Sequence, residues 1–342
     1  MSQAGFFDFE DRLEKLNAMG NPLHTLEQAI DFEAFRPTLE QIREKPRKSN
    51  AGRKPLDVVM MFKVLVLRTL YGLGDGKLEF HIRDRVSFMA FLGLGPGDDV
   101  PDEKTAWLFR EQLTQAGLID ELFEQFENNL AEAGFAASKG SIVDANIVEA
   151  PRQRNTREEN EQIKQGERPT SFDENPHKGR QKDTDARWTQ KRKRNYFGYK
   201  NHVNVDVEHK FVRRYTVTDA ATHDNQVIDD LLDEENTNRD VYGDSAYRSK
   251  AIHERLTSQG YRDRIHRKGH RGKPLDERGK RANTAKSRVR ARVEHVFGRQ
   301  AQFACHLGTT LLRCIGIKRA KAELGLRNLV YNLDRYARLV GG

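Results

Sequence analysis

The chain has 342 residues, of which 37% are hydrophobic and 32% charged, and its formal net charge is +8. This length suits about two domains, while short apolar stretches and an acidic N-terminus predict neither a membrane span nor a signal peptide. Two cysteines, Cys305 and Cys314, are too few for a disulfide framework or a zinc site, so we expect reduced thiols in a cytoplasmic protein.

The positive charge is concentrated in one window. Between Arg262 and Arg292 there are 13 Lys or Arg residues against three acidic residues, a net charge of +10, so the rest of the chain is near −2. Such a window favours a polyanionic partner, and nucleic acid is the usual one. Taken alone, it is equally compatible with a solvated face.

Residues 1–137 are predicted to form an all-helical domain. Apolar residues at helical spacing form one stripe over 55–71 and another over 118–130. Pro101 and Asp102 break the pattern and allow a new helix to begin near Glu103. Short helices in tandem fit a helix-turn-helix-like DNA reader and a plain helical or dimerising module equally well.

Residues 138–302 are predicted to form an α/β domain. Period-2 alternation and β-branched residues predict strands over 142–148, 202–207, 211–217, 240–244 and about 264–267. Capping residues and apolar spacing predict helices from Asp224, from about Lys250 and over 283–300. The order β-β-β-α-β-α-β-α is typical of a ribonuclease-H-like core, a mixed sheet flanked by helices. Residues 303–342 are expected to be a C-terminal helical segment packing on that core.

The segment over about 151–195 differs from the rest of this domain. It is charge-dense, and its only large apolar residues are Ile163, Phe172 and Trp188. Such a composition buries little surface, so we expect a polar insertion between the first two strands that has no order of its own without DNA. It ends in the basic run Lys191–Arg194.

Three carboxylates occupy related places in the predicted core. Asp144 lies in the first strand, Asp244 closes the fourth, which should be its neighbour, and Glu294 lies on the last helix one turn after Arg290. Each has an ordinary explanation: a strand end, a turn cap, and an ion pair with Arg290. An unpaired acid inside an apolar strand is costly, however. The joint placement favours a site for two divalent cations that act on phosphodiesters.

Six segments occur in an order that is also found in a known family: Ser141–Ala145, Tyr196–Lys200, Thr222–Asn225, Tyr242–Tyr247, Arg290–Glu294 with Phe297, and Asn328–Leu333. In these segments the chain resembles the DDE transposases of bacterial insertion sequences, in the group conventionally numbered five. The resemblance runs from the N-terminal helices nearly to the C-terminus.

The resemblance implies an enzyme that binds the terminal inverted repeats of its element through its N-terminal domain. It implies two Mg²⁺ ions, replaceable by Mn²⁺, at Asp144, Asp244 and Glu294, with Arg290 near the scissile phosphate. It also implies cleavage at the element ends, transfer of the 3′-hydroxyl ends to target DNA, a dimer or larger assembly on DNA, and a place at the bacterial nucleoid.

Two positions depart from the family pattern. Ser287 stands where relatives often carry Tyr, and Ala301 where they often carry Lys. Which side chains assist the triad therefore stays open, and the candidates for DNA contacts are Lys191, Arg192, Lys193, Arg194, Lys200, Arg288, Arg292, Arg299 and Gln300.

Three further residues allow two interpretations each. Lys200 is either a phosphate contact or an exposed strand charge. His223 could approach the metals, although a turn-and-cap role is favoured, and Trp188 could stack on a base or anchor its loop.

Two other functions are compatible with the sequence. One is a nuclease that cuts DNA ends without joining them. The other is a DNA-binding regulator built on an inactive transposase core, which predicts the loss of a triad carboxylate.

Overall fold

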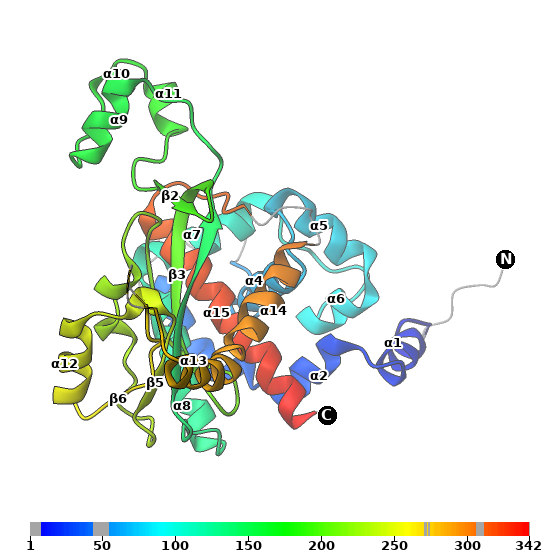
Figure 1. Cartoon of the computed structure of the whole chain (residues 1–342). Coiled ribbons are helices and arrows are strands. Elements are labelled where there is room, and N and C mark those ends of the chain that lie inside the picture. Colours follow the sequence, from blue (N-terminus) through cyan, green and yellow to red (C-terminus); the bar gives the residue numbers. More distant parts are fainter. Residues whose placement is uncertain (1–7, 44–54, 270–271, 273, 306–310, 342) are drawn as a thin grey trace. The chain divides into compact units, whose positions relative to one another are not determined.

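The structure is a computed structural model that describes residues 8–43, 55–269, 272, 274–305 and 311–341. The chain divides into two compact units (Figure 1). Residues 1–126, 300–309 and 326–342 belong to one, here called the helical unit, and residues 127–299 and 310–325 to the other, the sheet unit. The C-terminal segment 303–342 is thus shared between the units, where the sequence pattern suggested a single segment on the core. A long helix within it contributes residues to both.

The helical unit is built from short helices, as the sequence pattern predicts. The helix α4 (Val58–Leu70) is buried along the predicted stripe, and Asp57 caps it by accepting hydrogen bonds from the amides of Val59 and Met60. Asp102 caps α7 in the same way. The described elements are α1 (Asp8–Ala18), α2 (Pro22–Ala29), η1 (Phe32–Phe35), α3 (Arg36–Glu40), η2 (Gln41–Arg43), α4, α5 (Asp75–Asp84), α6 (Val86–Leu92), α7 (Glu103–Ala116) and the start of α8 (Leu118–Glu132).

The sheet unit contains a mixed sheet, as expected. Its strands are β1 (Ser141–Glu149), β2 (Arg187–Lys191), β3 (Arg194–Asp206), β4 (Val212–Asp219), β5 (Asp240–Tyr242) and β6 (Arg262–Asp263). The spatial order is β2-β3-β1-β5-β6, and β4 also pairs with β3. The first strand is antiparallel to β3 and parallel to β5. This arrangement makes β1 and β5 neighbours.

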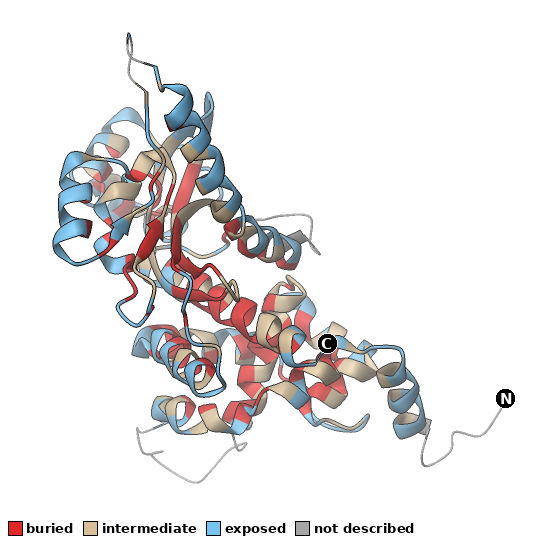
Figure 2. Ribbon diagram, turned by 60° about the horizontal axis from the view of Figure 1, so that its bottom comes forward, coloured by how far each residue is buried: buried red, intermediate tan, exposed pale blue. Residues whose placement is uncertain are grey.

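Helices complete the sheet unit: α12 (Lys250–Ser258), α13 (Glu277–Arg290), α14 (Val293–Cys305) and α15 (Ile317–Val340), the last two extending into the helical unit. Apolar side chains cover the sheet in two clusters. Val143, Ile228 and Tyr247 belong to one cluster, and Val148, Tyr199 and Leu324 to the other. Figure 2 shows the strands mostly buried and the outer faces of the helices exposed.

Three predicted elements differ from the structure. The helix expected from Asp224 is replaced by two short 3-10 turns, η3 (Asp224–Gln226) and η4 (Asp229–Leu231), and the Leu231 carbonyl at the end of η4 accepts a hydrogen bond from Asn204. The strand expected at 264–267 is the two-residue β6, slightly earlier. The helix expected over 283–300 begins at Glu277 and is broken at Ala291 and Arg292.

The insertion is not the structureless segment that its composition suggested. It contains α9 (Arg157–Lys164), α10 (Thr170–Glu174) and α11 (Pro176–Arg180), which stand beyond the end of the sheet at which β2 lies (Figure 1). Phe172 is fully buried, and Ile163 nearly so. A buried carboxylate, Glu159, joins the three helices through hydrogen bonds from Thr156, Ser171 and Lys178. Polar contacts therefore hold the three helices of the insertion together, which their small buried apolar area alone would not do.

The basic run at the end of the insertion is the tip of a hairpin. Arg192 and Lys193 connect β2 to β3 with φ values of 49° and 65°, as in a two-residue turn whose hand suits the twist of the strands. All four side chains from Lys191 to Arg194 are exposed. The hairpin thus presents a cluster of positive charge.

Within the described residues, no helix is both long enough and apolar enough to traverse a lipid bilayer. Cys314 is half-buried, and the side chain of Cys305 lies outside the described residues.

Candidate active site

Asp144 and Asp244 lie at the same level of two adjacent parallel strands. Asp144 is the fourth residue of β1, and the ladder pairs Ser141 with Val241 and Ile142 with Tyr242. Both strands advance at the same rise per residue, so Asp244 follows the last ladder pair at the level of Asp144. The predicted adjacency of their strands is therefore confirmed.

The end of β5 is shaped by Gly243 and by Asp244 itself. A Cβ atom at Gly243 would lie 3.2 Å from Val143 Cγ2, so the glycine lets the chain turn close against β1. Asp244 Oδ1 accepts a hydrogen bond of 2.7 Å from the amide of Ala246 and caps the 3-10 turn η5 (Ser245–Tyr247). Asp244 therefore caps a turn, as its local sequence suggests, and it also lies near Asp144.

Asp144 is largely buried and is bound by Arg290. Its Oδ2 accepts a hydrogen bond of 2.7 Å from Arg290 Nη1, and its Oδ1 accepts one from the amide of Ala145. The Asp144 side chain is 13% exposed. Arg290 is the last residue of α13 and reaches the acid at the strand rather than Glu294, the partner suggested by helical spacing.

The three carboxylates are close enough to repel one another. Burial raises the pKa of Asp144 to about 6, Arg290 and the Ala145 amide oppose this rise, and the charges of Asp244 and Glu294 add to it. Glu294 itself is exposed in the first turn of α14. Negative charge from three distant parts of the sequence therefore acts at one place in the fold.

The donor set suits a hard divalent cation, although the side chains do not form a finished cage. Within the described part of the chain, no three His, Cys, Asp or Glu side chains stand close enough to hold one metal ion together. Carboxylate oxygens are the ligands that Mg²⁺ prefers, and a cation would relieve the repulsion at Asp144. In this structure the positive charge there is supplied by Arg290.

A second polar network involves β3 and the turn after β4. Lys200 Nζ donates to Asp224 Oδ1 at 2.8 Å and to the Thr222 carbonyl at 2.7 Å, and its side chain is 12% exposed. His202 is fully buried, with Nε2 2.9 Å from Thr218 Oγ1. Burial lowers the pKa of His202 to about 4, although Asp224 opposes this, so the ring is neutral at pH 7.

This network corrects the expectations for Lys200 and Asp224 and agrees with one of the two interpretations of His223. Lys200 is not an exposed strand charge but a largely buried ion-pair partner. Asp224 receives Lys200 rather than capping a helix, and His223 instead caps η3 through its ring nitrogen, as the turn-and-cap interpretation predicts. Sequence reasoning missed the pairing because the two partners are 24 residues apart.

The other candidate DNA contacts are dispersed over the sheet unit and beyond it. Arg288 is exposed on α13, Arg292 donates to the Val207 carbonyl, and Arg299 is partly buried on α14. Gln300 is buried in the helical unit and donates to Asn328 at 2.8 Å. Of these four residues, Arg288 offers the most accessible charge.

The two positions that depart from the family pattern lie on α13 and α14. Ser287 Oγ is 3.3 Å from His266 Nε2, and Ala301 is exposed. Trp188 is 48% exposed on β2, with its ring against Phe197 and the Arg152 guanidinium over its face.

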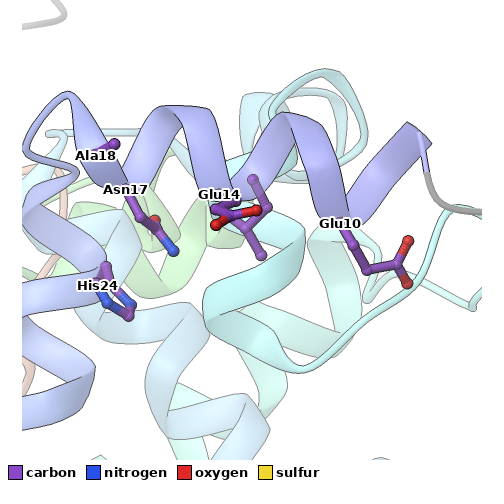
Figure 3. Close-up of a pocket in the computed structure, with 6 residues that line it drawn as sticks. Glu10, Glu14, Asn17, Ala18 and His24 are labelled. Atoms are coloured by element: carbon purple, nitrogen blue, oxygen red, sulfur yellow. The ribbon is translucent and has the colours of Figure 1, made fainter.

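A surface depression of about 510 Å³ lies in the helical unit (Figure 3) and contains none of the triad carboxylates. It is lined by side chains of α1 and α2, namely Glu10, Leu13, Glu14, Asn17, Ala18 and His24.

Two family models match the chain. Residues 136–333 match the model described as Transposase DDE domain, and residues 11–112 match the model described as Transposase domain (DUF772). No solved structure matches the chain. Because the first match covers more than half of the 342 residues and contains all three carboxylates, the chain belongs to the DDE-domain transposases and is a DDE transposase enzyme.

Proposed function

We propose that this enzyme is the transposase of a bacterial insertion sequence, in the group conventionally numbered five, and that it cuts DNA at the element ends and joins them to target DNA. The placement of Asp144 and Asp244 on adjacent parallel strands, beside Arg290 and Glu294, carries this proposal. The strand order β4-β3-β1-β5-β6, with β3 and β4 antiparallel to their neighbours, supports a ribonuclease-H-like core.

Asp144, Asp244 and Glu294 would hold two Mg²⁺ ions, or Mn²⁺ in their place, which when bound supply Lewis acidity to the scissile phosphate and to its attacking oxygen. The residues of the chain then have separate tasks. Asp144 and Asp244 are held by strand and turn, so their carboxylates are preorganised. Glu294, exposed in the first turn of α14, completes the set.

Arg290 would stabilise the phosphate. Its guanidinium carries fixed positive charge and several donors, which suit phosphate as well as carboxylate oxygens. In this structure it donates to Asp144, and from there it would reach a scissile phosphate bound at that carboxylate. Hydrolysis would break the P–O3′ bond at the element end, and the freed 3′-hydroxyl would then attack a target phosphodiester. Each step exchanges one phosphorus–oxygen bond for another and needs no oxidant or reductant.

The rest of the chain would bind DNA. The helical domain would read the terminal inverted repeats, while the hairpin tip Lys191–Arg194 and the exposed Arg288 would contact phosphates irrespective of sequence. Trp188, half-exposed beside Arg152, is available for a base, and Arg292, Arg299 and Lys200 would support the site from within the sheet unit. Two ends must be held together, so we expect at least a dimer on nucleoid DNA in the cytoplasm.

The test uses the full-length chain and labelled duplexes that carry the element's terminal repeats, with Mg²⁺ or with EDTA. We expect metal-dependent nicks at the repeat ends and covalently joined products, together with tighter binding to repeats than to random duplex. Nicks without joined products would indicate the nuclease. Tight repeat binding with no cleavage at any Mg²⁺ or Mn²⁺ concentration would indicate the regulator.

A further inference from the structure

Tyr247 carries a buried polar group with no partner. Its side chain is fully buried and packs with Val143, Val227 and Ile228. Among the described residues, none forms a hydrogen bond with its hydroxyl. An unpaired buried hydroxyl lowers the stability of a fold, so its presence requires an explanation.

The ring of Tyr247 is placed directly beside the carboxylates. Tyr247 follows Asp244, the cap of its 3-10 turn, by three residues, and Val143 of the same buried cluster precedes Asp144 in β1. Gly243 lies between the ring and β1, since a Cβ there would be 3.5 Å from Tyr247 Cδ2 and 3.2 Å from Val143 Cγ2. The hydroxyl is therefore held at the site by rigid packing.

Toward ionised carboxylates, the hydroxyl can act only as a hydrogen-bond donor. Three carboxylates lie close enough to act on its hydroxyl, first Asp224 and then Asp144 and Asp244. A phenol that stays protonated among carboxylates offers its proton to one of them.

We infer that Tyr247 is a positioning residue whose hydroxyl donates a hydrogen bond to the Asp144–Asp244 pair when these carboxylates hold a metal ion. In this structure each oxygen of Asp144 accepts one hydrogen bond, from Arg290 and from the Ala145 amide, and Asp244 Oδ1 accepts one from the Ala246 amide, which leaves acceptor positions for a further donor. A donor behind a metal ligand orients it, and removing such a donor weakens metal affinity. The inference rests on the proposed metal-dependent function.

Asp224 is the competing acceptor. It also lies near the Tyr247 ring, because Val227 and Ile228 follow it closely, and it already receives Lys200. A bond from Tyr247 to Asp224 would stabilise the fold with or without metal. The two acceptors therefore predict different responses to removal of the hydroxyl.

The experiment compares Tyr247→Phe with a matched control, Tyr199→Phe. Tyr199 is equally buried, but its hydroxyl donates to both oxygens of the buried Asp183 at 2.8 and 2.7 Å. The readouts are the thermal unfolding midpoint of the full chain in EDTA and the binding of Mn²⁺ or Mg²⁺ followed by calorimetry. In EDTA, Tyr199→Phe should lower the midpoint, whereas Tyr247→Phe should leave it unchanged or raise it. For metal binding, Tyr247→Phe should weaken affinity about 10-fold, and Tyr199→Phe should leave it near wild type.

Three results would overturn the inference. Wild-type metal affinity in Tyr247→Phe would show that the hydroxyl does not serve the carboxylates. A midpoint in EDTA that falls as far as in Tyr199→Phe would show that it serves the fold, through Asp224. A wild-type chain that binds neither ion would defeat the proposed two-metal function itself, and this failure is read from the wild type alone.

Discussion

Glu159 in the insertion and Asp144 in the sheet are two buried carboxylates of the same unit with opposite electrostatics. Each faces one cation, Lys178 and Arg290 respectively. Burial opposes ionisation of both. At Glu159, hydrogen bonds from Lys178, Ser171 and the Thr156 amide nevertheless bring the pKa down to about 2. At Asp144, Arg290 and one amide do not offset burial and two nearby carboxylates, and the pKa is about 6.

The difference lies in how each charge is compensated. Glu159 has enough donors for its oxygens, so its charge stabilises the ion pair that joins three helices. Asp144 stands among like charges with too few donors, a condition that lowers stability and favours a cation. A buried acid with enough donors, such as Glu159, stabilises the structure. A buried acid with too few donors, such as Asp144, indicates a reactive site. The following substitutions test that distinction.

The largest effect is expected at the triad. Asp144→Asn, Asp244→Asn and Glu294→Gln should each leave folding and end binding nearly intact and reduce Mg²⁺-dependent cleavage and joining about 10³-fold or more, because these variants lack a Lewis-acid contribution of several kcal/mol. Asp144→Asn should unfold no earlier than wild type, since it removes a crowded buried charge. Double variants should lose little more cleavage and joining activity than the single variants, as expected for residues that act as one unit.

Rates of end cleavage and joining, with thermal unfolding as the control, decide this prediction. A Glu294→Gln protein that cleaves near the wild-type rate would remove Glu294 from the triad.

Arg290→Ala should have a smaller effect, a decrease of about 10²-fold in cleavage rate, comparable with the removal of one preorganised donor. It removes a phosphate partner but no metal ligand. The control is Arg288→Ala, on the same helix but exposed, which should alter DNA affinity without a comparable decrease in single-turnover rate. Equal decreases in the two variants would mean that Arg290 acts only through general positive charge.

Glu159→Gln should lower the free energy of opening of the insertion helices by about 2 kcal/mol and leave the triad intact. This value allows for the partial exposure of Lys178. Because the pKa of Glu159 is lowered in the folded chain, its contribution is complete above about pH 4.5 and disappears as the pH falls toward 2. Amide exchange in α9–α11 at pH 7 measures the change. The control Glu161→Gln removes an exposed pair with Lys164 on the same helix and should change exchange hardly at all. Exchange that is equally fast in wild type and Glu159→Gln would mean that the carboxylate does not hold these helices together.

The smallest effect concerns charges that no acid compensates. Replacing the turn Arg192-Lys193 with Asn-Gly removes two positive charges and keeps a sequence suited to the left-handed turn. The slope of log affinity for DNA against log salt should become shallower by about 0.9 for each phosphate that the turn no longer neutralises. Lys250→Ser, a change at an exposed position on α12, is the control and should leave the slope as it is. An unchanged slope in the turn variant would place the hairpin away from DNA.

Several features of the fold were predictable from the sequence because their signals are local. Alternating β-branched residues predicted β1 and the C-terminal part of β3, and apolar spacing predicted α4 and α8. The order of the predicted strands and helices indicated that Asp144 and Asp244 would lie on neighbouring strands, and the ladder between β1 and β5 confirms it.

Only the tertiary structure decided how the charges are compensated. Glu159 is satisfied by residues 12 and 19 positions away, Lys200 pairs with Asp224 24 positions away, and Arg290 reaches Asp144 across 146 positions. Composition therefore made the insertion look structureless, and helical spacing suggested the wrong partner for Arg290. The physical reason is that a strand or helix pattern depends on neighbouring residues, whereas the free energy of a buried charge depends on every donor and acid that the fold brings to it.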